Sequence, residues 1–72
     1  MKGDVMELTE KAKIRLTHWL RHNEEHVREY RDFAYELKAS GMTESARHLR
    51  EMAEIVDRSN ESLARALGSL PG

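Results

Sequence analysis

The sequence predicts an all-α fold, a long antiparallel two-helix hairpin that dimerises into a four-helix bundle. Apolar residues recur at alternating intervals of three and four along most of the chain. Helix-breaking residues gather at only two places, and the 72 residues include one proline and no cysteine. We expect a chain this short to be a single domain, residues 1–72, or a piece of a larger assembly, because so small a core rarely stabilises a fold without a partner.

The first helix is expected over about residues 5–39. Asp4 and Glu7 stand three residues apart, as in a capping box, where two side chains satisfy free backbone N–H groups. At the other end, Gly41 suits the left-handed conformation that commonly follows a helix, because glycine has no Cβ to clash. The turn is therefore expected at residues 40–42.

The second helix is expected over about residues 44–67. Thr43 precedes it, and threonine is a good N-cap because its hydroxyl accepts a hydrogen bond from the first helical turn. The helix ends before Pro71, since proline cannot continue a helix.

Each helix carries an apolar seam whose spacing suits helix–helix packing. The seam of the first helix comprises Leu16, Leu20, Asn23, Val27, Tyr30, Ala34 and Leu37, and that of the second comprises Ala46, Leu49, Ala53, Val56, Asn60, Leu63 and Leu67. Folding the chain at Gly41 pairs these residues in order, from Leu37 with Ala46 to Leu16 with Leu67. This constant register is typical of an antiparallel coiled coil.

The only polar pair in this register is Asn23 with Asn60. Their carboxamides are expected to hydrogen-bond and to specify the register, at some cost in stability, as a buried asparagine does in coiled coils. The alternative left open is that both asparagines are tolerated beside water.

The two sides of the hairpin differ in polarity. The charged flank comprises Lys13, Arg21, Glu24, Arg28, Arg31, Arg47, Arg50, Glu54, Asp57 and Glu61. The apolar flank comprises Leu8, Ala12, Trp19, His26 and Phe33 on the first helix and Met52, Ile55, Ser59 and Ala66 on the second. Two helices cannot bury this flank, so a second copy is expected to cover it as a homodimer, or another protein to dock on it. The predicted interface residues are Trp19, Phe33, Met52, Ile55 and Ala66.

Three of the four histidines, His18, His22 and His26, follow one another at intervals of four. Adjacent members of this series can chelate a divalent transition metal ion such as nickel, zinc or cobalt. The first and last lie about 12 Å apart along the helix, so all three cannot share one ion. The most compact set is His22, Glu25 and His26, with His18 as an alternative partner of His22. A further ligand has to come from a second chain, either from the same cluster or from His48.

In the competing interpretation, the histidines bind no metal and lie at an interface or on the surface, where they stack on aromatic rings or form hydrogen bonds with glutamates. The H-x-x-E-H string that ends at His26 also matches the inverted zinc-peptidase signature, but no other helix offers a clear third ligand. A ferritin-like di-iron site needs a glutamate where the chain has Asn23. No phosphate loop or nucleophile set is present, so the sequence predicts no enzyme.

The charge and the hydropathy of the chain argue against two classes of partner, nucleic acids and membranes. Twelve basic and thirteen acidic residues give a net charge of −1, which argues against nucleic acid. We find no apolar run of membrane-spanning length and no secretory leader, so we expect a cytoplasmic protein without a membrane partner. The absence of cysteine excludes disulfides and thiolate metal sites.

Nearly the whole chain resembles a small uncharacterised helical-hairpin domain of anaerobic bacteria and archaea. The resemblance rests on the string His18-Trp19-x-x-His22-Asn23-x-x-His26-x-x-Glu29-Tyr30, followed by Ala34, Gly41 and Asn60-x-x-Leu63. That domain is associated with nickel-binding chaperone-like proteins, to which it is sometimes fused. The resemblance implies that His18, His22, Asn23 and His26 are the family-like positions and that nickel is worth testing.

Two functions are therefore expected as alternatives. The first is non-enzymatic binding or handling of nickel, zinc or cobalt through the histidines of the first helix. The second is a metal-free oligomerisation or protein-interaction module that docks through the apolar flank. The spacing of the histidines does not itself select nickel over zinc.

Overall fold

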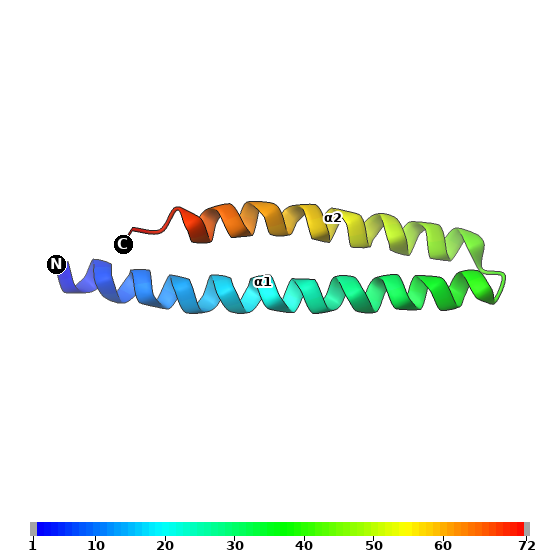
Figure 1. The fold of residues 1–72 in the computed structure, drawn as a ribbon, viewed down its shortest axis with the longest axis horizontal. Helices are drawn as coiled ribbons and strands as arrows, with labels where there is room; N and C mark the ends of the chain where they lie inside the picture. The colour runs from blue at the N-terminus through cyan, green and yellow to red at the C-terminus, as the bar shows by residue number, and fades with distance from the viewer. Residues whose placement is uncertain (1, 72) are drawn as a thin grey trace.

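A computed structural model describes residues 2–71 of the chain. Two helices account for nearly all of them, α1 over Lys2–Ala39 and α2 over Thr43–Gly68. They run antiparallel and pack side by side as a rod of 58 × 14 × 13 Å, with the connecting turn at one end (Figure 1). The predicted all-α hairpin is confirmed. Neither helix combines the length and the apolar character needed to cross a membrane within these residues.

The helices begin slightly earlier than the sequence predicts. α1 begins at Lys2, so Asp4 lies within the helix instead of at its cap, and the side chain of Asp4 lies outside the described part of the structure. α2 begins at Thr43 itself, and its N-cap is Met42, which has φ −88° and ψ 62° and makes no capping side-chain hydrogen bond. The predicted threonine cap is wrong because the carbonyl of Met42 already accepts the first helical hydrogen bond, from Ala46 N at 3.0 Å.

Gly41 makes the tight turn between the helices. Its φ of +88° is the left-handed conformation expected at this position. Met42 N donates to Leu37 O at 2.9 Å, and Gly41 N donates to Lys38 O at 3.0 Å. These are the two hydrogen bonds of a Schellman motif, so the turn satisfies carbonyl groups at the end of α1 while it reverses the chain.

The core between the helices is narrow and consists mainly of small side chains. Val27, Ala34, Ala46 and Ala53 are buried, the other predicted seam residues are partly or fully buried, and no large side chain of the described residues is fully buried. In the predicted register each buried alanine stands opposite a larger residue: Ala46 opposite Leu37, Ala34 opposite Leu49, and Ala53 opposite Tyr30. Pairing small with large side chains lets two helices pack closely.

Asn23 and Asn60 meet in this core. Nδ2 of Asn23 donates to Oδ1 of Asn60 at 2.8 Å, and Nδ2 of Asn60 donates to the carbonyl oxygen of Leu20 at 3.2 Å. Asn60 is 7% exposed, and no buried side-chain nitrogen or oxygen within the described residues lacks a partner. The polar pair is therefore satisfied inside the seam. Its role in specifying the register stays a prediction.

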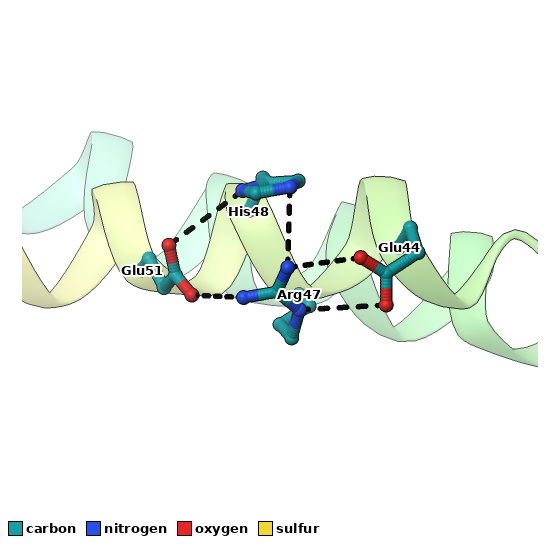
Figure 2. Close-up of polar contacts among 4 residues, drawn as sticks. All are labelled: Glu44, Arg47, His48 and Glu51. Atoms are coloured by element: carbon teal, nitrogen blue, oxygen red, sulfur yellow. Dashed lines mark hydrogen bonds and ion pairs between the residues drawn. The ribbon is translucent and has the colours of Figure 1, made fainter.

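An ionic cluster covers the first turns of α2 (Figure 2). The guanidinium of Arg47 donates to both carboxylate oxygens of Glu44, at 2.9 Å and 3.4 Å, and to Glu51 at 2.6 Å. The hydrogen bond between Arg47 and Glu44 is the main cause of a lowered pKa of Glu44 and of a raised pKa of Arg47. Because Glu44 is charged in the first turn, it complements the helix dipole where no side chain caps the helix.

Candidate functional site

His18, His22 and His26 form a ladder along α1. The ring centroids of neighbours are 5.0 Å apart in both steps, with interplanar angles of 33° and then 84°. Two imidazoles bound to one tetrahedral ion at about 2.0–2.1 Å have ring centres roughly 5 Å apart. Adjacent members of the ladder therefore already stand at the separation that a shared ion requires.

His26 is oriented by two neighbours on its own helix. Its Nδ1 lies 3.5 Å from Oε2 of Glu29, which forms an ion pair with the imidazole when the ring is protonated. The ring also stacks on Tyr30, with centroids 5.9 Å apart and an interplanar angle of 12°. A carboxylate beside one ring nitrogen commonly selects the tautomer and orientation of a metal-binding histidine. In His26 this leaves Nε2 as the nitrogen for a ligand.

Glu25 does not join the histidines as the sequence suggested. Among the side chains that the structure describes, those of residues 5–71, no three of histidine, cysteine, aspartate or glutamate lie close enough to hold a metal ion. The compact set of His22, Glu25 and His26 is therefore not assembled in one chain. Glu25 and His26 are adjacent in the sequence, and side chains one apart on a helix do not face each other. The carboxylate beside His26 belongs to Glu29, three residues further along the same helix.

His48 is engaged by residues of its own helix (Figure 2). Its Nε2 lies 3.3 Å from Nη2 of Arg47, and its Nδ1 lies 3.6 Å from Oε2 of Glu51. The guanidinium keeps its positive charge at every physiological pH and therefore opposes a cation at Nε2. His48 therefore has a fixed positive charge beside one of its two ring nitrogens.

The apolar flank is open to solvent in the single chain. Its large side chains are substantially exposed: Leu8 65%, Trp19 49%, Phe33 54%, Met52 39% and Ile55 59%. Ser59 and Ala66 are also exposed, while Ala12 and His26 are partly buried. The hairpin therefore leaves five bulky apolar side chains of this flank exposed, which is typical of a docking surface.

The charged flank holds a groove near the turn that the sequence reasoning missed. The groove has a volume of about 610 Å³ and is lined by Arg31, Tyr35, Lys38, Ala39, Arg50 and Glu54. Arg31 also reaches across the hairpin to Asp57 at 3.5 Å. None of the histidines lines the groove, so it is separate from the candidate metal ligands.

Comparison with known proteins places the hairpin in a family. The family model of a domain of unknown function, DUF8180, matches residues 12–70. The chain belongs to this family. In this DUF8180 domain the matched segment includes both seams, the histidine ladder and most of the apolar flank. No curated protein and no solved structure matches the chain.

Proposed function

We propose that this DUF8180 domain is a non-enzymatic module that binds a divalent transition metal ion and acts as a homodimer. The observation that supports it best is the pair His22 and His26, with ring centroids 5.0 Å apart and Glu29 beside Nδ1 of His26. Nickel, zinc and cobalt all accept such imidazole pairs. The preference for nickel rests only on the resemblance to domains associated with nickel-binding chaperone-like proteins.

The homodimer in this proposal is supported by the exposed apolar flank. Burying a side chain of the size of Trp19, Phe33 or Met52 contributes on the order of 1.5 to 3 kcal/mol. Among the apolar seam residues of a single hairpin, Val27 and three alanines are buried and the others are only partly buried. A second copy therefore provides the larger core that a chain of this size needs.

Calorimetric titration of the chelator-treated protein tests the metal-binding proposal. Nickel, zinc and cobalt chlorides are titrated in turn at neutral pH, and at least one is expected to show saturable uptake. The bound ion is expected to be released on acidification, because protonated imidazole cannot bind a metal. Absence of saturable uptake for all three ions would reject metal binding.

The second candidate is a metal-free interaction module. The exposed apolar flank supports it as well as it supports the metal-binding homodimer. Stacking of His26 on Tyr30 and its contact with Glu29 also suit a histidine that packs in an interface. In that case His26→Leu preserves or strengthens the dimer, because it removes the cost of desolvating an imidazole. The cytoplasm is the proposed location for either function.

A further inference from the structure

We propose that a second copy of this chain completes the metal site, in an antiparallel dimer whose two-fold axis passes between His22 and His26. This inference rests on the proposed metal-binding function. In His22 and His26 one chain offers an adjacent pair of imidazoles, and no third histidine, aspartate or glutamate side chain among residues 5–71 lies close enough to share an ion with both. A tetrahedral ion takes four ligands, and two copies of the pair supply four imidazoles.

The histidine pair points in the direction that a second copy has to occupy. At about 100° per residue, Trp19, His22, His26 and Phe33 lie within roughly 60° of one another around α1, about a quarter turn from the seam. Trp19 and Phe33 are half exposed there. A partner that covers these aromatic side chains therefore covers His22 and His26 as well.

The direction of the partner decides whether the two histidine pairs meet. In an antiparallel dimer α1 packs on the partner's α1, and an axis midway between His22 and His26 puts His22 opposite the partner's His26. In a parallel dimer α1 packs on the partner's α2, which leaves the two pairs on diagonally opposite helices of the bundle. Only the antiparallel arrangement forms one shared site.

The sizes of the side chains on the apolar flank of α2 also fit this two-fold axis. The hydrogen bond between Asn23 and Asn60 shows that these two residues lie level with each other in the hairpin. Because the helices are antiparallel, each step forward along α1 is matched by one step back along α2. The midpoint of His22 and His26 is Glu24, one residue after Asn23, so it lies level with Ser59, one residue before Asn60. An axis at Ser59 brings this small residue against its own copy and puts Met52 opposite the partner's Ala66, a large side chain against a small one.

The charges along the same side of α1 also favour the antiparallel arrangement. Exposed Lys11 and Arg15 lie on the N-terminal side of the histidines, and exposed Glu29 and Glu36 lie on the C-terminal side. The proposed axis exchanges these two halves, so Lys11 and Arg15 face the acidic half of the partner's α1. Such complementarity opposes wrong alignments more than it adds affinity.

A single cysteine tests the direction, because the natural chain has none. In Ser59→Cys the two thiols meet at the proposed axis and are expected to form a disulfide between copies under mild oxidation. The matched control is Ser45→Cys, on the same side of α2 but about 21 Å along the helix. A dimer in which Ser59→Cys links no better than this control would overturn the antiparallel arrangement.

The metal content of the wild-type dimer tests the shared site. We expect one ion per two chains and, with cobalt, the intense visible absorption of a tetrahedral centre. Mixing wild-type chains with His22→Ala,His26→Ala chains is expected to lower the number of tetrahedral centres per wild-type chain. One ion per chain would overturn the shared site and leave metal binding standing. A dimer that takes up no nickel, zinc or cobalt would overturn both proposals.

Discussion

Asn23 and Asn60 are joined by a side-chain hydrogen bond of 2.8 Å between the two helices. Asn60 also donates through Nδ2 to the carbonyl oxygen of Leu20, so both the oxygen and the nitrogen of its carboxamide form a hydrogen bond. A slip of the helices would separate these groups within a partly buried seam. The pair is therefore expected to favour this register over others, as a buried asparagine does in coiled coils.

Replacing both asparagines by leucine is expected to stabilise the hairpin and to permit other oligomers, because an apolar pair fits more than one register. Asn23→Leu alone leaves the buried amide of Asn60 short of a partner, at a cost of about 1 to 3 kcal/mol. Urea unfolding and light scattering measure the two effects. Equal stability and one oligomeric state for the single variants and the double variant would show that the pair does not specify the register.

Ala34→Leu and Ala53→Leu are each expected to destabilise the hairpin by about 1 to 3 kcal/mol, because extra atoms force the helices apart. Both alanines have no exposed surface. Ala64→Leu is the matched control, since Ala64 is exposed on α2. Thermal unfolding followed by circular dichroism compares the three variants. A loss of stability no greater than that of the control would contradict the close packing.

Gly41→Ala is expected to lower the free energy of unfolding by about 1 kcal/mol or more, because alanine is strained at a φ of +88°. An added Cβ would meet nothing within 4 Å, so the loss comes from the backbone alone. Gly68→Ala is the control: its Cβ also meets nothing within 4 Å, and φ there is not positive. This second variant is expected to leave stability unchanged or to raise it by about 0.4 to 1 kcal/mol.

Combining Trp19→Ala with Phe33→Ala is expected to dissociate the dimer, since both rings lie on the apolar flank. Tyr35→Ala is the matched control, because Tyr35 is 75% exposed and lies on the charged flank. Light scattering at micromolar concentration gives the mass of each variant. If the wild-type protein is itself a well-folded monomer under these conditions, the homodimer is rejected.

His22→Ala and His26→Ala are each expected to reduce the affinity for nickel or zinc strongly, because a chelating pair becomes a single imidazole. His18→Ala is expected to reduce it less, and helix content should barely change in any of the three. Calorimetric titration and circular dichroism provide the two readouts. The pair has no special role if His18→Ala has the largest effect.

Two glutamates provide a further control on this histidine prediction. Glu29→Gln is expected to lower the metal affinity by about 10- to 100-fold, because Glu29 orients His26. Glu25→Gln is expected to leave the affinity nearly unchanged. The opposite order would identify Glu25 as the carboxylate that serves the site.

The hairpin and its seam could be predicted because helical spacing specifies which residues share a face. Leu16 and Leu67, like every residue between them in the predicted seam, lie partly or fully buried. Gly41 could be placed because a reversal of the chain at this point requires a left-handed residue. These features depend on local geometry and on the apolar pattern, both of which a sequence displays directly.

Other features depend on where side chains and turn carbonyls point, and only the tertiary structure decided them. The N-cap of α2 is Met42 instead of Thr43, because the Schellman turn ends at this residue. Nε2 of His48 contacts the guanidinium of Arg47. Long side chains on a helix lean toward its N-terminus, so Glu29 reaches back to His26, three residues before it. The sequence by itself determined which residues lie on each face, and the folded structure decided which of their polar atoms meet.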